Sequence, residues 1–384
     1  MKETSLLTNP IAFLAATRPA DPVQFCAPGM LAERARVFLG GCPGCVSLAV
    51  KANPTPQTLR HILRAGIRTF DVASPTEIAL ILDMCPEAAL HYNNPVRDRD
   101  EIAFALRSGV RSFAVDAGDE LTKLADAVAD CASIGRCDFD RSDIEISIRF
   151  KLPMQAAAYD FGAKFGATPD VAANLLARVD KAGFRPALTF HPGTQCTDPQ
   201  AFADHIAAAA RIAHRAGTMP ERLNVGGGFP SNRTGSHDLS RYFAAISGAM
   251  AGFGPQRPAL ICEPGRALTG DAFALAARVK SLRPGIAYLN DGIYGGLSEF
   301  PSIGLPSFQV ITPDGRINPD RGQERILFGP TCDALDRLPG PVALPVDLAE
   351  GDYLLFSSMG AYVAGVSTTF NGYGQWDLVE VSGL

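Results

Sequence analysis

The sequence predicts an α/β protein: a (β/α)8 TIM barrel with a second, all-β C-terminal domain that the N-terminal segment completes. Three observations support this fold class. From about residue 46 to 265, short β-rich runs alternate with longer helical stretches; eight such runs follow in series; and the helical pattern fades after about residue 270. A chain of 384 residues also exceeds what one hydrophobic core usually supports.

The eight β-rich runs predict the strands of the barrel. They cover residues 46–52, 69–73, 89–93, 112–116, 144–150, 187–191, 223–226 and 259–263, and the amphipathic helices between them include 56–65, 75–83, 98–108, 169–182 and 199–216. Several of these helices begin with proline near the first turn, where its missing N–H is tolerated. An open doubly wound sheet is the alternative, but eight units over roughly 250 residues favour a closed barrel.

The region after residue 270 predicts an all-β domain. Glycine and proline separate short β runs at residues 273–279, 325–328, 341–345, 353–356 and 376–381. We therefore expect the barrel to span residues 28–268. A β-sandwich or β-barrel domain would take residues 1–27 together with 269–384.

Composition and charge exclude two classes of partner. The net charge is −5 and the isoelectric point is near 5.7, whereas nucleic acids and anionic membranes are bound by clustered Lys and Arg. No run approaches the ~20 apolar residues of a membrane span. Glu3 stands where a signal peptide would be basic. We therefore expect a cytoplasmic protein that binds neither nucleic acid nor membrane.

The cysteines predict reduced thiols rather than a disulfide framework, because the nine are scattered and odd in number. Cys42 and Cys45 form a C-P-G-C pair that could be a redox or metal element. A zinc site would need two more ligands at matching spacing, and the sequence has no second such pair. We expect two thiols in the loop before a strand, and no metal.

Polar residues end nearly every predicted barrel strand. In a barrel the C-terminal ends of the strands meet at one mouth, where the βα loops build the functional site. One polar strand end would be unremarkable for solubility, but a complete series indicates a site. The series is Lys51, Asp71, Asn93, Asp116, Arg149, His191, the glycines at 226–228, and Glu263 with Arg266 just beyond.

The residue types in this series indicate a particular chemistry. Lys51 stands among apolar neighbours, and we expect burial to lower its pKa and favour attack of the amine on an aldehyde. The glycine triplet, with Gly265 and Arg266, could cradle a phosphate. Glu263 suits a carboxylate that keeps a pyridine nitrogen protonated. Taken singly these residues have ordinary alternatives, such as an ion-paired lysine or a plain glycine turn; their joint order favours the functional interpretation.

Short motifs in a fixed order extend over almost the whole chain. They are AVKAN at 49–53, FDVAS at 70–74, KFG at 164–166, HPGTQ at 191–195, GGGFP at 226–230, EPGR at 263–266, GPTCD at 329–333, GAY at 360–362 and FNG at 370–372. With this set the chain resembles the fold-type III (alanine-racemase-like) decarboxylases that depend on pyridoxal 5′-phosphate. It is most similar to their ornithine/lysine decarboxylase branch.

The resemblance implies roles for particular residues. Lys51 would hold the cofactor as a Schiff base, and Cys332 would protonate the carbanion left after CO2 departs. Asp333 and Tyr294 would bind the substrate, and His191 would stack on the cofactor ring. The full cofactor-binding set would be Asp71, Arg149, His191, Thr194, Gly227, Gly228, Glu263, Gly265, Arg266 and Tyr362.

The family also implies a head-to-tail homodimer with active sites at the interface. Each subunit would donate Cys332 and Asp333 to the site of its partner. The loop that carries them is bounded by Pro and Gly, where a functional group is more natural than in a core.

The loop around Asp333 also bears on the substrate. Aspartate after Cys332 resembles the ornithine type, whereas the diaminopimelate type usually has Glu there; a carboxylate suits an ammonium group and repels a second carboxylate. Ornithine enzymes usually carry another acid about a dozen positions beyond the residue that corresponds to Asp291, in the segment that gauges substrate length. That acid is missing from residues 298–304 of this chain, and only Glu299, which lies earlier, could substitute for it.

The sequence therefore predicts decarboxylation of a basic L-amino acid, ornithine or lysine, to putrescine or cadaverine in polyamine biosynthesis. Diaminopimelate, carboxynorspermidine and D-ornithine or D-lysine stay open as alternative substrates. An amino-acid racemase would need a tyrosine-like base on the opposite face, and Cys332 with Asp333 argues against it. A non-catalytic cofactor carrier or regulatory pseudo-enzyme is disfavoured, because Lys51, Glu263 and Cys332 are all present.

Overall fold

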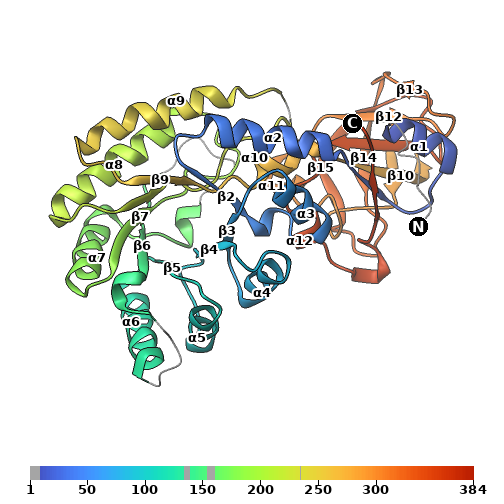
Figure 1. Ribbon diagram of the computed structural model, residues 1–384. Coiled ribbons are helices and arrows are strands. Elements are labelled where there is room, and N and C mark those ends of the chain that lie inside the picture. Colours follow the sequence, from blue (N-terminus) through green and yellow to red (C-terminus); the bar gives the residue numbers. More distant parts are fainter. Residues whose placement is uncertain (1–8, 134–138, 154–160, 234) are drawn as a thin grey trace.

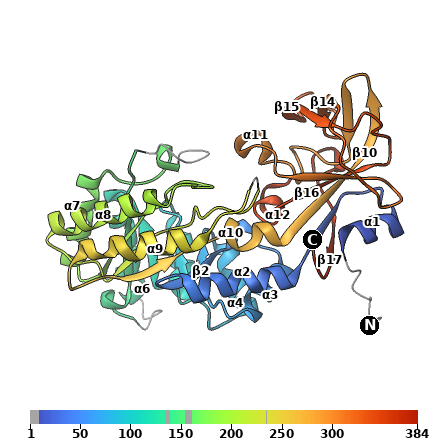
Figure 2. The same cartoon turned by 90° about the horizontal axis from the view of Figure 1, so that it is seen from above.

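The computed structural model describes residues 9–133, 139–153, 161–233 and 235–384, and it confirms the predicted fold class. Eight parallel strands, β2 to β9 in chain order, close into a barrel. Figures 1 and 2 show this barrel beside a separate all-β part, which carries the orange and red end of the chain. The barrel strands are β2 (Cys45–Ala49), β3 (Thr69–Val72), β4 (Ala89–Tyr92), β5 (Ser112–Val115), β6 (Glu145–Arg149), β7 (Arg185–Thr189), β8 (Arg222–Asn224) and β9 (Ala259–Cys262).

Helices cover the outside of the barrel. Local sequence signals fix their starts: the Ser74 side chain accepts the N–H of Glu77, and Asp98 with Glu101 forms a capping box. Their apolar faces and the outward side chains of the strands form one large core. The helices are α2 (Pro28–Gly41), α3 (Pro56–Arg64), α4 (Pro75–Met84), α5 (Arg99–Arg107), α6 (Gly118–Ser133), α7 (Pro169–Lys181), α8 (Gln200–Ala216) and α9 (Leu239–Ala249), with the short α10 (Arg266–Thr269) after the last strand.

The second part is a nine-stranded sheet with its own apolar cores. The N-terminal segment completes it, because β1 (Val23–Cys26) runs antiparallel to β10 and parallel to β17. Figure 1 shows α1 (Pro10–Thr17, dark blue) beside these orange and red strands. The other strands are β10 (Phe273–Arg283), β11 (Ile286–Leu289), β12 (Phe308–Ile311), β13 (Ile317–Asn318), β14 (Gln323–Phe328), β15 (Arg337–Leu344), β16 (Tyr353–Ser357) and β17 (Asp377–Glu380), with short helices α11 (Phe300–Ile303) and α12 (Val363–Val366).

Two hydrogen bonds join the sheet to the mouth of the barrel. The backbone N–H of Tyr362 donates to the carbonyl of Ala52 at 2.6 Å, and the buried Asn53 side chain donates to the carbonyl of Gly360 at 2.8 Å. The two barrel residues in these hydrogen bonds, Ala52 and Asn53, lie within two positions of Lys51. The sheet therefore places the Tyr362 loop directly against the lysine segment.

All eight barrel strands end before their predicted last residue, and at two of them the difference changes the position of a predicted site residue. The first strand stops at Ala49, and residues 50–52 form a 3-10 turn that carries Lys51. The predicted strand 187–191 is β7, which ends at Thr189 and leaves His191 in the following loop. In both cases the predicted site residue lies outside the strand, so its side chain does not follow the alternation of a strand.

Several expectations concern features of the whole chain. Over the residues that the structure describes, no helix is long and apolar enough to cross a membrane, and no group of His, Cys, Asp and Glu is arranged to hold a metal ion. Seven described cysteines are free thiols, whereas Cys131 is disulfide-bonded, so the expectation of reduced thiols throughout is wrong at that position.

Candidate active site

A pocket at the C-terminal ends of the barrel strands gathers most of the predicted site residues. Its walls come from the ends of β2, β3 and β9, the loops after β7 and β8, and the Tyr362 loop of the sheet domain. The lining residues are Ala49, Lys51, Asp71, His191, Thr194, Gln195, Gly227, Gly228, Phe229, Glu263, Gly265, Arg266 and Tyr362.

Lys51 forms an ion pair with Asp71, Nζ to Oδ2 at 2.8 Å. The Lys51 side chain is 48% exposed because it lines the open pocket, while Asp71 is buried at 2%. Burial lowers the pKa of Lys51, but attraction to Asp71, and also to Tyr362 and Glu263, outweighs burial and raises the pKa above its usual value. The expectation of a lowered Lys51 pKa is therefore wrong, because β3 places a carboxylate beside the amine.

Glu263 follows β9 and is held by two amides. The side-chain N–H groups of Asn93 and Asn224 both donate to Oε1, the latter at 2.6 Å. Among the described residues, no hydrogen bond occupies Oε2 of this carboxyl. Burial, and then the charge of Asp71, raise the pKa of Glu263 to about 8. A cation next to Glu263 would reverse this shift, so the site suits a basic ring nitrogen.

The glycine triplet after β8 packs so closely against neighbouring backbone that a Cβ does not fit at Gly227 or Gly228. Gly228 has φ +84°, and a Cβ there would lie 2.4 Å from the carbonyl oxygen of Gly193. A Cβ at Gly227 would lie 2.9 Å from the carbonyl oxygen of Glu263 and 3.2 Å from Nε2 of His191. Side chains are therefore sterically excluded at both positions, so this wall of the pocket is bare backbone, which suits a phosphate.

His191 is neutral in this environment. Burial first, and then the positive charges of Arg149 and Lys51, lower its pKa well below the usual value. Nδ1 accepts the backbone N–H of Gly193 at 3.0 Å, which assigns the ring proton to Nε2. A neutral imidazole in the pocket wall can stack on a flat ring without adding positive charge.

Arg266, the first residue of α10, is held by Glu299. The guanidinium donates from Nη1 and Nη2 to the two carboxylate oxygens at 2.8 and 2.5 Å, and it lies 4.9 Å from the centre of the Tyr362 ring. The sequence offered Glu299 as a substitute for the missing substrate-gauging acid. Its bidentate pairing instead commits it to the arginine beside the predicted phosphate cradle.

Three predicted strand-end side chains lie outside the pocket wall: Asn93, which donates to Glu263, and Arg149 and Asp116. Arg149, at the end of β6, places its guanidinium 5.2 Å from the centre of the Phe165 ring. Asp116 accepts the backbone N–H of Gly166 at 2.8 Å. Both contacts fasten the segment around residue 165, so the structure gives these two side chains a role in holding that loop, and the predicted cofactor contact of Arg149 stays a prediction.

Cys332, Asp333 and Tyr294 form a separate group on the sheet domain. The Tyr294 hydroxyl donates to Asp333 Oδ2 at 2.5 Å, and the Cys332 backbone N–H donates to Asn371 Oδ1 at 3.1 Å. Cys332 is exposed, and none of the three lines the pocket around Lys51. Within one chain, the predicted proton donor and substrate carboxylate are thus separate from the predicted cofactor pocket.

Sequence reasoning missed one residue that shapes the pocket, Asn224, and gave another, Glu299, a different role. Asn224 sits inside β8 and bonds Glu263, and Glu299 lies just before α11 and bonds Arg266. Asn224 carried a signal, a polar residue within a buried strand only two positions before the glycine triplet. No sequence signal indicated that Glu299 pairs with Arg266, because the two residues are 33 positions apart.

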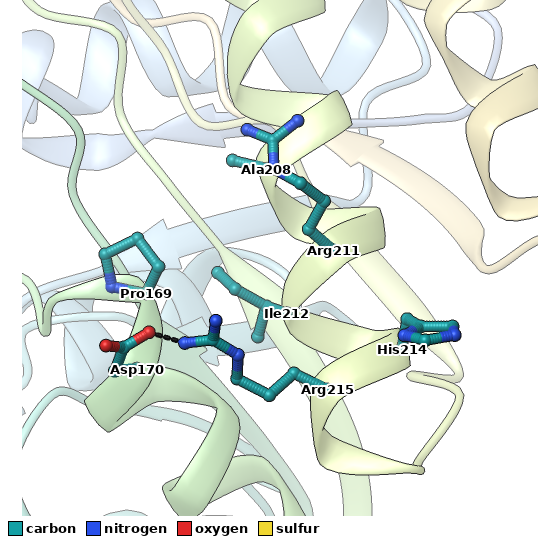
Figure 3. Close-up of a pocket in the computed structure, with 7 residues that line it drawn as sticks. All are labelled: Pro169, Asp170, Ala208, Arg211, Ile212, His214 and Arg215. Carbon is teal, nitrogen blue, oxygen red and sulfur yellow. Dashed lines mark ion pairs between the residues drawn. The ribbon is translucent and has the colours of Figure 1, made fainter.

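A second hollow lies on the outer helices and lacks this chemistry. It is formed by α7 and α8, where Asp170 and Arg215 form an ion pair (Figure 3). Its lining contains no lysine, and hence no amine that could bond an aldehyde. The barrel mouth is therefore the better candidate for the active site.

The residues around Lys51 fit pyridoxal 5′-phosphate in their chemistry. Lys51 supplies an amine for the aldehyde, the glycine wall without side chains suits the phosphate, and Glu263 suits the ring nitrogen. Asp71 supplies a further observation: its Oδ1 is buried and has no hydrogen-bond partner within the described parts of the chain. A buried acceptor left without a donor is costly, which indicates that a bound group completes the site.

The chain is similar in sequence to proteins of known identity. The chain is 31% identical to an ornithine decarboxylase of Nicotiana glutinosa over 346 residues (85% of this chain, 75% of the relative). It is 29% identical to antizyme inhibitor 2 of Xenopus laevis over 357 residues (85% and 73%).

Two solved structures share the fold. One is the arginine decarboxylase of Paramecium bursaria Chlorella virus bound to agmatine, with TM-score 0.83, 25% identity and coverage of 96% of this chain and 98% of that one. The other is the lysine/ornithine decarboxylase of Vibrio vulnificus complexed with putrescine, with TM-score 0.80, 25% identity and coverage of 97% and 98%.

The family model described as "Pyridoxal-dependent decarboxylase, pyridoxal binding domain" matches residues 32–270. This match covers the whole barrel and every residue of the pocket wall except Tyr362. With its amine, glycine wall and buried carboxyl in the places described above, the chain belongs to the family of pyridoxal-dependent decarboxylases.

Proposed function

We propose that this enzyme decarboxylates ornithine or lysine, giving putrescine or cadaverine for polyamine biosynthesis in the cytoplasm. The reaction class and the cofactor follow from the family, and the choice of a basic amino acid rests on Asp333. The lysine/ornithine and arginine decarboxylases with the same fold also act on basic amino acids, which supports this choice.

When bound, pyridoxal 5′-phosphate supplies an aldehyde that bonds amines and a ring that accepts the electrons released with CO2. The residues of the chain perform the rest. Lys51 provides the amine that holds the cofactor, and the ion pair with Asp71 favours the protonated form of this amine. Glu263, fixed by Asn93 and Asn224, holds a proton on the ring nitrogen. The glycine wall and Arg266 bind the phosphate.

Asp333 is the observation that carries the choice of substrate. The backbone N–H of Leu335 and the Tyr294 hydroxyl both donate to its carboxylate, and these two hydrogen bonds lower the pKa of Asp333. Asp333 therefore stays ionised at neutral pH. An ionised carboxylate beside an exposed thiol favours a substrate whose side chain ends in an ammonium group and disfavours one that ends in a carboxylate.

We propose a homodimer in which the Cys332–Asp333 loop of each subunit completes the pocket of the other. Two observations support this arrangement. The loop is exposed and lies outside the Lys51 pocket of its own chain, and Leu335 next to it is an exposed large apolar side chain, 72% accessible. A partner subunit that covered this loop would also bury the Leu335 side chain.

The direct test is release of CO2 from a panel of ornithine, lysine, arginine, diaminopimelate and carboxynorspermidine, with D-ornithine and D-lysine included. We expect release from L-ornithine or L-lysine, with putrescine or cadaverine as product. Borohydride reduction followed by peptide mapping should fix the cofactor on Lys51, and Asp333→Asn should raise KM for the diamino acids more than it lowers kcat. Release from diaminopimelate alone would contradict the proposal.

The same panel separates the other functions. A racemase would convert L-ornithine to D-ornithine without CO2. A non-catalytic relative, as the likeness to antizyme inhibitor 2 suggests, would release CO2 from no substrate although it folds normally. Cys332 and Lys51 are both present in this chain, which favours the catalytic outcome.

A further inference from the structure

In the structure, Cys42 of the C-P-G-C motif contacts a cysteine outside the motif, which the sequence did not predict. Cys42 does not pair with Cys45; its sulfur lies 2.9 Å from the sulfur of Cys262, which is 220 positions away in the chain. Cys45 instead contacts the Thr69 hydroxyl at 3.5 Å. Sulfur atoms in a disulfide are about 2.05 Å apart, so Cys42 and Cys262 need to approach by less than about 1 Å to bond.

The two thiols differ in the way that an oxidisable pair requires. Cys42 follows α2 directly and is partly exposed, whereas Cys262, the last residue of β9, is fully buried. The hydrogen bond with Cys262 lowers the pKa of Cys42, while burial raises the pKa of Cys262. Cys42 is thus the more accessible sulfur and has more thiolate character. Cys262 is positioned to attack an oxidised Cys42 and form a disulfide with it.

Cys262 is also coupled to the cofactor site through its neighbour Glu263. The Glu263 backbone N–H donates to the Gly226 carbonyl at 2.8 Å, and the Glu263 carbonyl oxygen lies where a Cβ on Gly227 would come within 2.9 Å. The end of β9 and the glycine wall are therefore in direct backbone contact, so a shift of Cys262 toward Cys42 would be transmitted to Glu263 and to the glycine wall.

We propose that Cys42 and Cys262 form a reversible disulfide when the protein meets hydrogen peroxide, and that this bond weakens cofactor binding by displacing Glu263. The Cys42 thiolate attacks one peroxide oxygen and gives a sulfenic acid, releasing the other oxygen as water after protonation. The Cys262 sulfur then attacks the Cys42 sulfur and a second water leaves. Two thiols are oxidised by two electrons in total, and the peroxide is reduced to two waters.

The first test identifies the bond. Cys42 and Cys45 lie between the trypsin sites at Arg36 and Lys51, on one peptide, so the holoenzyme is made as the Cys45→Ser variant, which leaves one thiol on that peptide. After treatment with hydrogen peroxide, we expect a cross-linked peptide joining Cys42 to Cys262 that dithiothreitol removes. Cys42→Ser should give no such peptide. A Cys42–Cys45 disulfide in the wild-type protein, or no cross-link in the Cys45→Ser variant, would overturn the proposal.

The second test separates this pair from the exposed Cys332, which peroxide also reaches. The readout is the dissociation constant of pyridoxal 5′-phosphate, measured before and after peroxide in the wild type, Cys42→Ser and Cys45→Ser. We expect a several-fold rise in the wild type and in Cys45→Ser, restored by dithiothreitol, and no change in Cys42→Ser. An equal rise in Cys42→Ser would assign the effect to another thiol, and no rise in the wild type would show that the disulfide leaves Glu263 in place.

Discussion

At the scale of single residues, the charge on Lys51 depends on Asp71. Their contact at 2.8 Å raises the pKa of the lysine, so a smaller fraction of the amine is neutral at a given pH. Only the neutral amine adds to an aldehyde, and its fraction increases as the pH rises toward the pKa. We predict that Asp71→Asn lowers the Lys51 pKa and moves the pH profile of cofactor attachment to lower pH. The measurement is the rate of the visible absorbance change on adding pyridoxal 5′-phosphate across a pH series.

The control for Asp71→Asn is Asp126→Asn, which removes a carboxylate paired with Arg99 on the exposed surface. Its pH profile should match that of the wild type. A profile that stays unchanged in Asp71→Asn would show that another group sets the charge of Lys51.

Glu299 permits a second prediction at this scale. Its pair with Arg266 is largely buried, with side-chain exposures of 17% and 4%, and removing one partner of a buried pair typically costs about 3–5 kcal/mol. We predict that Glu299→Gln lowers the melting temperature of the cofactor-free protein, and that pyridoxal 5′-phosphate raises it by more than in the wild type, because the phosphate replaces the lost negative charge. Thermal unfolding with and without cofactor measures both effects.

Glu33→Gln is the matched control, since Glu33 pairs with Arg36 on the exposed surface. Exposed pairs contribute little, so its melting temperatures should stay close to those of the wild type. Equal cofactor-induced shifts in Glu299→Gln and the wild type would place the phosphate away from Arg266.

At the scale of elements, the loop after β8 depends on glycine while the helix α9 does not. Gly228 has φ +84° and stands where a Cβ would meet the Gly193 carbonyl at 2.4 Å, whereas a Cβ on Gly248 in α9 would meet nothing within 4 Å. We predict that Gly228→Ala destabilises the protein by more than about 1 kcal/mol and weakens cofactor binding. Gly248→Ala should leave binding unchanged and stabilise the helix by about 0.5–1 kcal/mol.

Urea unfolding and titration with pyridoxal 5′-phosphate measure these two effects. Wild-type cofactor affinity in Gly228→Ala would mean that the phosphate does not approach this wall.

At the scale of the whole molecule, the proposed dimer divides one site between two chains. Lys51→Ala and Cys332→Ala should each be inactive alone, because each removes one half of the site. When the two variants are mixed and exchange subunits, about half of the dimers are mixed and each has one intact site, so we predict recovery of about a quarter of wild-type activity. Activity after mixing, with subunit exchange shown by mass, is the measurement.

A mixture of Lys51→Ala with Glu263→Ala is the control for this experiment. Both residues belong to the pocket of a single chain, so no combination of these subunits has an intact site and no activity should return. Failure of the first mixture to recover, or equal recovery in both, would contradict a shared site.

The sequence was sufficient for the framework of the molecule. Eight strands alternating with helices are encoded locally, by β-branched runs, proline at helix starts and capping residues such as Ser74, so the barrel was predictable. The same holds for the gathering of Lys51, His191 and Glu263, because the C-terminal ends of parallel strands in a barrel must share one mouth. Local pattern and closure together determine which residues meet.

Only the tertiary structure decided what these residues do to one another. It showed that Asp71 raises the pKa of Lys51, that Glu299 takes up Arg266, and that Cys42 meets Cys262 rather than its neighbour in the motif. Each depends on a distance between side chains far apart in the chain. The strength of an ion pair and the reactivity of two thiols change when their atoms move by about an ångström. Sequence periodicity predicts only which face of a helix or strand a side chain occupies, so it cannot predict these contacts.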